Sequence, residues 1–262
     1  MARDGIGAVL TELGEQVTSA ADAAAVRDRY LDVLDRIGQA RLPLPLPAHV
    51  SVKLTHLGLE VDQDACLHHL MALAARAAER RAFLWIDMEE SRYVDVTLEL
   101  FRRVRAARDA VGVCLQAYLR RTPADLQTLL PLGPAIRLVK GAYSEPPHVA
   151  FPRKRDVDAA YLALAEQLLL QAVRSRARPV FGTHDVGLLA RIRARARELG
   201  APEDTYEVHM LYGIRTADQR TLARAGVRVR VLISYGSHWF PWYMRRLAER
   251  PANVWFLLRN LL

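Results

Sequence analysis

Two positively charged side chains lie three residues apart in Arg-Leu-Val-Lys-Gly-Ala-Tyr, which spans residues 137–143. Arg137 and Lys140 can together hold a carboxylate or a phosphate, because both donate several charge-assisted hydrogen bonds. An anionic substrate or cofactor therefore explains this segment better than a packing role does. Gly141 follows directly and permits a close turn of the backbone at this point.

Lysine is rare in this chain, which makes its positions informative. Of 37 basic residues, only Lys53, Lys140 and Lys154 are lysines. Lys53 ends the run Val-Ser-Val-Lys, and in a strand it shares a face with Ser51. From there it either binds a ligand or reaches solvent.

Asp87 ends the apolar run Trp-Ile-Asp at residues 85–87. A carboxylate within a hydrophobic strand rarely stays unpaired, because its desolvation has to be offset. Lys53 and Asp87 lie on neighbouring predicted strands, so an ion pair between them is the simplest shared explanation. It could belong to a ligand site or be a structural pair.

The sequence Thr-His-Asp at residues 183–185 follows one predicted strand and opens a helix. Backbone N–H groups at a helix N-terminus favour phosphate or another anion. Asp185 could equally be a plain N-cap. His209 lies at the end of another predicted strand, where a histidine satisfied by ordinary hydrogen bonds is the commoner case.

A third group of ionisable residues lies near the C-terminus, where Arg245, Arg246 and Glu249 fall on one face of a predicted helix. By itself this pattern is typical of an exposed, salt-bridged helix face. Above a site, two adjacent arginines can instead clamp a carboxylate while Glu249 receives an ammonium. Such an arrangement suits a zwitterionic amino acid.

The elements that must position these groups alternate eight times along the chain. Short apolar or β-branched runs predict strands, and three- and four-residue apolar spacing predicts helices at residues 20–37, 66–81, 94–110 and 157–177. The predicted strands are Ile6–Leu10, Val50–Leu54, Phe83–Met88, Val113–Ala117, Ile136–Val139, Pro179–Gly182, Tyr206–Met210 and Val227–Ile233.

Eight strand–helix units in 262 residues predict a single α/β domain over residues 1–262, a (βα)8 or TIM barrel. No G-x-G-x-x-G follows the first strand, which argues against an open dinucleotide-binding sheet. Barrel active sites lie at the C-terminal ends of the strands. Most of the polar residues above fall at such ends, so an enzyme is a better interpretation than an inert barrel.

The net charge of +8 is spread as single arginines along alanine-rich helices. No aromatic residues are interleaved with them, so nucleic-acid binding has almost no support. Cys66 and Cys114 lack metal-ligand spacing, and we expect buried, reduced thiols and no metal. No apolar segment resembles a signal peptide or a membrane span, so we expect a cytoplasmic protein.

Taken together, the motifs resemble the monofunctional bacterial proline dehydrogenases, which are flavin-dependent. The resemblance covers nearly the whole chain, and the motifs occur in the order found in that family. The matching stretches are Ser-Val-Lys-Leu-Thr (51–55), Ile-Asp-Met-Glu-Glu (86–90), Gln-Ala-Tyr (116–118), Arg-Leu-Val-Lys-Gly-Ala-Tyr (137–143), Val-Ala-Phe-Pro-Arg-Lys (149–154), Thr-His-Asp (183–185), Met-Leu-Tyr-Gly-Ile-Arg (210–215) and Arg-Arg-Leu-Ala-Glu-Arg (245–250).

The resemblance implies a distorted barrel that holds FAD, with the last helix over its mouth. It implies oxidation of L-proline to Δ1-pyrroline-5-carboxylate by hydride transfer to the flavin N5, the first step of proline catabolism. The substrate-site residues that it implies are Lys53, Asp87, Tyr143, Arg245, Arg246 and Glu249. The FAD-site residues are Gln116, Arg137, Val139, Lys140, Gly141, Thr183, His184, Asp185 and His209.

The resemblance also implies partners. A quinone would accept the electrons, which suggests peripheral contact with the inner face of a membrane. A pyrroline-5-carboxylate dehydrogenase would be the pathway partner.

The sequence departs from the family pattern in three respects. Leu232 replaces a substrate-contacting tyrosine, which predicts weaker proline binding or a modified cyclic amino acid as substrate. His209 replaces a glutamine. The chain starts almost at its first strand, which favours a homo-oligomer. A related flavin oxidoreductase and a non-catalytic binding barrel stay open as alternatives.

Overall fold

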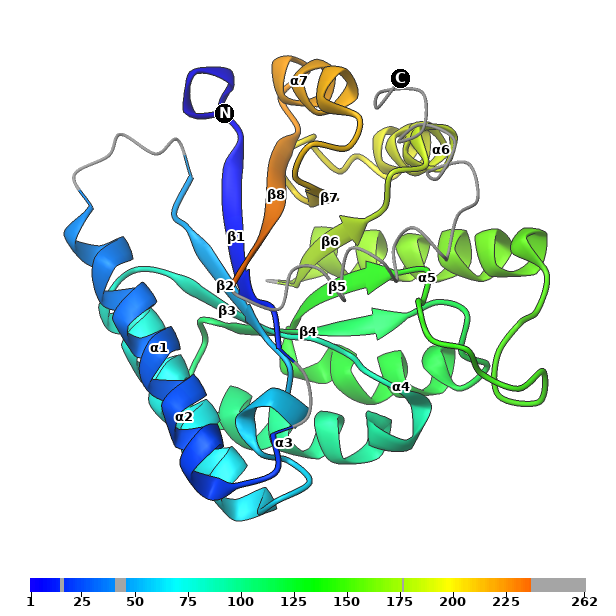
Figure 1. Ribbon diagram of the computed structural model, residues 1–262. Coiled ribbons are helices and arrows are strands. Elements are labelled where there is room, and N and C mark those ends of the chain that lie inside the picture. Colours follow the sequence, from blue (N-terminus) through cyan, green and yellow to red (C-terminus); the bar gives the residue numbers. More distant parts are fainter. Residues whose placement is uncertain (15–16, 41–45, 176, 237–262) are drawn as a thin grey trace, which may run out of the picture.

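A computed structural model describes residues 1–14, 17–40, 46–175 and 177–236 of the chain. Within these ranges eight parallel strands close into one barrel in the order of the sequence, with β8 paired to β1 (Figure 1). The strands are β1 (Gly7–Glu12), β2 (His49–Val52), β3 (Phe83–Ile86), β4 (Val111–Gln116), β5 (Ala135–Val139), β6 (Arg178–Gly182), β7 (Glu207–Leu211) and β8 (Arg228–Tyr235).

Helices follow the strands and surround the barrel, and α1 and α2 pack side by side (Figure 1). The α-helices are α1 (Ala20–Gln39), α2 (Gln63–Glu79), α3 (Val94–Ala107), α4 (Thr122–Leu129), α5 (Lys154–Arg174), α6 (Val186–Glu198) and α7 (Thr216–Arg224). Short 3-10 helices are η1 (Ala2–Asp4), η2 (Thr55–Leu57), η3 (Ser91–Tyr93) and η4 (Leu130–Leu132). No helix in the described ranges is long and apolar enough to cross a membrane.

The eight predicted strands are all present, and each observed end lies within two residues of the predicted one. The (βα)8 barrel is therefore confirmed. Helix ends were predicted less well, because capping residues determine where a helix begins and ends. The Asp62 carboxylate accepts hydrogen bonds from two backbone N–H groups, so α2 begins at Gln63 rather than at Cys66. The predicted last helix, with Arg245, Arg246 and Glu249, lies outside the described residues.

Alternation along each strand divides the apolar residues into two groups. One face of the strands packs against the helices and forms the large core. The other face fills the barrel interior, where Trp85 packs with Val9, Phe83, Ala135 and Val180. Trp85 is fully buried. A small apolar layer therefore closes the centre of the barrel. Buried polar residues lie in β2, β5, β7 and β8, and Asp87 follows β3 directly.

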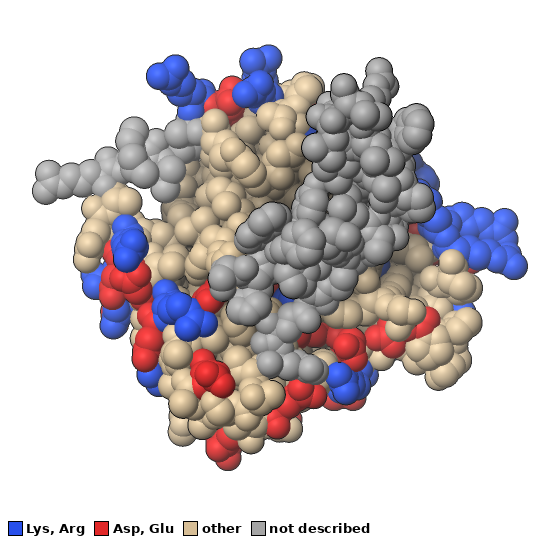
Figure 2. All heavy atoms as spheres, in the orientation of Figure 1, with Lys and Arg blue, Asp and Glu red and all other residues tan. Residues whose placement is uncertain are grey.

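The molecular surface carries charges of both signs. Figure 2 shows lysine and arginine side chains together with aspartate and glutamate on the described part of one face, without a continuous basic surface. This distribution (Figure 2) agrees with the expectation that the arginines are spread singly along the helices and form no nucleic-acid-binding surface.

Candidate active site

A buried ion pair crosses the barrel interior between β3 and β5. The Arg137 guanidinium contacts the carboxylate of Asp87 and donates a second hydrogen bond to Ser51 Oγ at 2.8 Å. Ser51 in turn donates to Asp87 Oδ1 at 3.0 Å. The guanidinium also lies over the Trp85 ring, 5.1 Å from its centroid. Arg137 is 6% exposed in its side chain, so its charge depends on this carboxylate for compensation.

The sequence-based prediction of an ion pair between Lys53 and Asp87 is wrong, because Asp87 pairs with Arg137 instead. Arg137 is the favoured partner of this carboxylate, because its guanidinium is buried and planar and donates hydrogen bonds to Asp87 and Ser51 together. Lys53 lies one residue beyond the end of β2 and is only partly buried. No ion pair of Lys53 is present among the described residues.

The Cys114 thiol lies beside the same pair. Arg137 Nε donates to Cys114 Sγ, and the thiol donates to Asp87 Oδ1 at 3.5 Å. Burial raises the pKa of Cys114 to about 12, and that of Cys66 to about 12 as well. Both cysteines are free and buried, as expected, and both stay neutral thiols.

Two lysines and two aspartates form a four-membered charge network where β5 and β6 end. Lys140 Nζ lies 2.5 Å from Asp158 Oδ1 and 3.0 Å from Asp185 Oδ2. Lys154 contacts Asp158 as well and lies 3.4 Å from Asp185 Oδ2. Chiefly through its hydrogen bond with Lys140, the pKa of Asp185 is lowered to about 2. An anionic ligand at Lys140 would have to share the lysines with these carboxylates.

The segment from Thr183 to Asp185 joins β6 to α6 and is held by several hydrogen bonds. Asp185 caps the helix by accepting a hydrogen bond from Leu188 N at 3.1 Å, so the N-cap interpretation is confirmed. Thr183 Oγ1 accepts from Asp185 N at 3.1 Å. His184 Nε2 accepts from Leu211 N at 2.8 Å, which fastens the turn to the end of β7. Anion binding at this turn stays a prediction.

Gln116 and Gly141 lie where β4 and β5 end. Gln116 is 2% exposed, and its Oε1 has no hydrogen-bond partner among the described residues. Gly141 has a φ of 122°, and a Cβ atom there would lie 2.2 Å from the Tyr118 ring. Glycine is therefore required at 141, and Gln116 offers a buried acceptor to a ligand N–H.

Replacing Gly141 with alanine should destabilise the protein. Backbone strain costs about 1–3 kcal/mol, and the clash with Tyr118 adds to it. Gly133→Ala is the matched control, because Gly133 also has a positive φ, of 55°, but a Cβ there meets nothing within 4 Å. Urea unfolding of both variants measures the difference. Equal losses at the two positions would show that the Tyr118 contact is unimportant.

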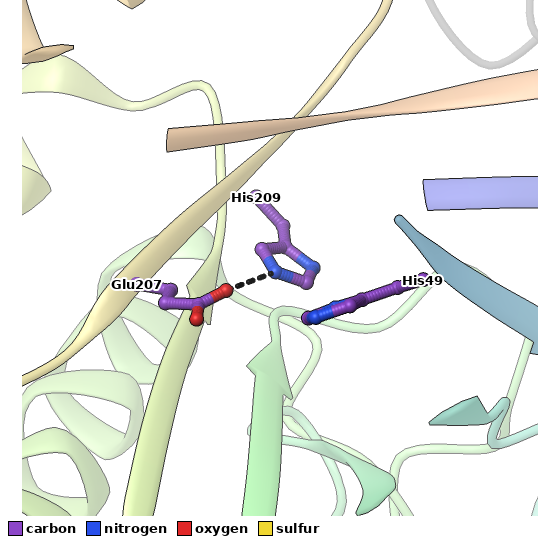
Figure 3. A group of neighbouring side chains, drawn as sticks. All are labelled: His49, Glu207 and His209. Atoms are coloured by element: carbon purple, nitrogen blue, oxygen red, sulfur yellow. Dashed lines mark hydrogen bonds and ion pairs between the residues drawn. The ribbon is translucent and has the colours of Figure 1, made fainter. Parts of the chain in front are cut away.

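A second polar group occupies the barrel interior around His49, Glu207 and His209. The three side chains point toward one another (Figure 3), and His209 Nε2 lies 3.3 Å from Glu207 Oε2. Glu207 also pairs with Arg178 and, at 2.7 Å, with Arg230. His49 Nδ1 accepts from the Trp85 indole at 3.1 Å. The spacing of the three groups could suit a metal ion, but their lone pairs are already largely committed to arginines and tryptophan.

Both histidines of this group are neutral. Burial lowers the pKa of His209 to about 4 and that of His49 well below its usual value. Because Glu207 is held as a carboxylate by His209 and two arginines, Nε2 of His209 carries the hydrogen and donates it. His209 Nδ1 is then a buried acceptor with no partner in the described part of the chain.

This arrangement predicts acid sensitivity. The unfolded chain binds protons at its histidines as the pH falls through about 6.5, whereas folded His209 stays neutral until about pH 4. Stability should therefore be intact above pH 6.5 and fall between pH 6.5 and 4, by about 3 kcal/mol for His209 alone. Urea unfolding at pH 7 and 4.5 measures the loss. His209→Gln should reduce the loss over this range, and an unchanged loss would contradict the assignment.

Sequence reasoning did not predict the hydrogen-bond partners of Ser51, Glu89 and Glu145. Ser51 bridges Arg137 and Asp87, and its position two residues before Lys53 placed it on the interior face without indicating that contact. Glu89 binds both polar groups of Thr55, and Glu145 binds the backbone and hydroxyl of Ser91. Only the closed barrel brings these loop residues together.

Comparison with known proteins bears on this site. The family model described as "Proline dehydrogenase" matches residues 1–259. Proline dehydrogenase 1 of Bacillus subtilis is 36% identical over 260 residues, which is 99% of this chain and 83% of that protein. The proline dehydrogenase of Deinococcus radiodurans is also 36% identical, with the same two coverages.

A solved structure shares the fold. It is proline utilization A (PutA) from Bdellovibrio bacteriovorus inactivated by N-propargylglycine, with a TM-score of 0.85 and 24% identity. The alignment covers 94% of this chain and 30% of that longer chain.

Proposed function

The chain belongs to the proline dehydrogenase family, and from this premise we propose which of its residues bind the substrate and the flavin. The chain is an oxidoreductase that oxidises L-proline to Δ1-pyrroline-5-carboxylate in proline catabolism. The match of the family model along residues 1–259 carries this conclusion. Residues 1–262 would form one catalytic domain.

The family is flavin-dependent, and we propose FAD as the cofactor of this chain. When bound, FAD accepts a hydride at its N5 atom. The buried acceptor Gln116 Oε1 suits an N–H group of the flavin ring, and the absence of a side chain at Gly141 leaves room for the Tyr118 ring beside it. A pyrophosphate at the N-terminus of α6 would share Lys140 with Asp158 and Asp185. The full proposed set is Gln116, Arg137, Val139, Lys140, Gly141, Thr183, His184, Asp185 and His209.

For the substrate, we propose that Lys53 binds the carboxylate together with Arg245 and Arg246. Lys53 lies one residue past the end of β2 and is partly exposed, so its ammonium can meet a ligand at the barrel mouth. Arg245, Arg246 and Glu249 lie outside the described residues, and their roles rest on the family motif. Asp87 would act indirectly by holding Arg137, and Tyr143 would wall the ring. Positioning the ring and favouring a neutral amine would account for most of the catalysis.

Leu232, in place of the tyrosine of the family pattern, supports a difference in the part of the pocket that would contact the substrate ring. It packs, partly buried, against the interior layer that contains Trp85 and Val9. A leucine here offers no hydroxyl, so we propose that this part of the site is apolar and that proline binds more weakly than with tyrosine. A modified cyclic amino acid would then compete with proline more effectively.

We propose a quinone as electron acceptor, which would require contact with a membrane surface. The product contains a carbon–nitrogen double bond that opens to an aldehyde in water, so a dehydrogenase acting on that aldehyde, a pyrroline-5-carboxylate dehydrogenase, would consume it. An assembly of identical chains is a further proposal.

A steady-state assay tests the function. The purified protein, reconstituted with FAD, is given L-proline and a soluble quinone, and reduced quinone and Δ1-pyrroline-5-carboxylate are both measured. We expect one molecule of each per proline consumed. Quinone reduction that needs no proline, or a protein that retains no FAD, would contradict the proposal.

A further inference from the structure

A buried carboxylate clamps the backbone just beyond Lys53. Glu89 Oε1 accepts a hydrogen bond from Thr55 N at 3.1 Å, and Oε2 accepts from Thr55 Oγ1 at 2.6 Å. Glu89 is 7% exposed and Thr55 3%. Both carboxylate oxygens of Glu89 are thus bonded to a single residue of the neighbouring loop.

The clamp fixes the corner at which β2 ends. Thr55 is the first residue of η2, and the next constraint of this turn is the hydrogen bond from Leu57 N to Lys53 O at 3.2 Å. Lys53 lies between Val52, the last residue of β2, and this turn. Hydrogen bonds therefore constrain the backbone on both sides of Lys53. On the β2 side, Val52 O accepts from Asp87 N at 2.8 Å. Lys53 therefore has little freedom to shift its backbone.

The Glu89–Thr55 contact joins β2 and β3 at equivalent positions beyond their ends. Lys53 lies two residues before Thr55, and Asp87 lies two residues before Glu89. The Glu89–Thr55 bonds thus extend the β2–β3 pairing beyond its last ladder contact, at the level where the proposed substrate groups lie. A change in the clamp would move Lys53 relative to Asp87 and Arg137.

Burying this carboxylate is costly, since no cation contacts it in the described residues. Burial raises the pKa of Glu89, while the Thr55 bonds and the charge of Lys53 oppose that rise. A buried carboxylate with this desolvation cost is unfavourable if its only role is stability, because an apolar contact would stabilise the turn without that cost. Two hydrogen bonds to one residue fix the position of the turn.

We propose that Glu89 and Thr55 are positioning residues for Lys53 and thereby set the affinity of the site for the substrate carboxylate. This inference rests on the proposed role of Lys53. The proposed effect of the clamp requires no contact with substrate or flavin. Its effect is to keep the ammonium of Lys53 at the distance and angle that a charge-assisted hydrogen bond requires.

The test measures binding of cyclopentanecarboxylate, a ring carboxylate without an oxidisable C–N bond, to the flavin-loaded protein by calorimetry. Thr55→Val removes the Oγ1 bond and keeps the shape of the side chain. We expect its Kd to rise about tenfold, since small displacements of a binding group are costly. Thr55→Ser, which keeps both bonds, should stay within about threefold of the unmodified protein.

Glu89→Leu removes both acceptors and should weaken binding at least as much as Thr55→Val, whereas Glu90→Leu is the matched control at the next residue. The Glu90 side chain is 46% exposed, and its only ion pair among the described residues is with Arg92, so its loss should leave the Kd unchanged. Flavin content and Tm are recorded for every variant. A lower Tm with an unchanged Kd for Thr55→Val and Glu89→Leu would reduce the clamp to a structural role and overturn the proposal.

A double-mutant cycle identifies the route of the effect. If the clamp acts through Lys53, Thr55→Val should have no further effect on Kd in a Lys53→Met background. A tenfold effect that persists there would overturn the inference while leaving the role of Lys53 intact. If Lys53→Met alone leaves the Kd unchanged, the proposed carboxylate site itself fails.

Discussion

Asp87→Ala is expected to destabilise the protein by about 3–5 kcal/mol and to lower its flavin content. The substitution removes the carboxylate that compensates the buried guanidinium of Arg137. Removing one partner of a buried pair leaves an uncompensated charge, which costs that much in other proteins. Ser51 would also lose the acceptor of its hydroxyl. Urea unfolding monitored by circular dichroism measures the free energy, and released flavin is measured by absorbance.

Asp87→Asn is the matched control for this prediction. The amide keeps an oxygen for Arg137 and Ser51 but carries no charge, so it should recover part of the lost stability. If alanine at residue 87 costs less than about 1 kcal/mol, within the range of ordinary exposed pairs, the central place of this ion pair in the barrel would be wrong.

Lys53→Met is expected to raise the KM for L-proline about 10- to 100-fold, with a smaller effect on kcat. A hydrogen bond to a charged group contributes about 1.5–3 kcal/mol, which corresponds to that range. Because the ammonium would bind the carboxylate in both the bound substrate and the transition state, its loss should appear mainly in KM.

Two observations accompany the Lys53 variant. Lys53→Arg keeps the charge and should recover part of the affinity, although a planar guanidinium differs in shape from an ammonium. Flavin content should be unchanged in both variants. A normal KM in Lys53→Met, or a loss of flavin instead of substrate affinity, would place Lys53 outside the substrate site.

The barrel could be predicted from sequence because its signals are local. Each strand is a short apolar run, each is followed by a helical pattern, and parallel strands joined by helices close in chain order. The predicted ends of the strands also identified the region where Arg137, Gln116 and Asp185 lie. The predicted strand ends give the place of each residue along the chain, and the alternation along a strand gives the face on which its side chain lies.

The partners of these residues could not be predicted in the same way. Neighbouring strands suggested that Asp87 would pair with Lys53, yet Arg137 reaches it from β5 across the interior. Sequence order reveals which strands are adjacent but not which side chains meet across a closed barrel. His209 is similar: its bond to Glu207 lies within β7, but the arginines that hold Glu207 come from β6 and β8.

The charge network at Lys140 also qualifies a sequence-based expectation. Lys140 looked like a cation available to a ligand, but Asp158 and Asp185 already contact it. Asp158 carried no motif that drew attention to it, since a single aspartate in a helix is ordinary. The packing of α5 against β5 and β6 brings it to Lys140.

Anaerobic addition of L-proline to the flavin-loaded protein tests the central claim most directly. The visible absorbance of oxidised flavin is recorded while proline is added without any electron acceptor. We predict that the flavin band bleaches completely and that one Δ1-pyrroline-5-carboxylate forms per flavin. A flavin that binds normally but keeps its absorbance at saturating L-proline would contradict the account.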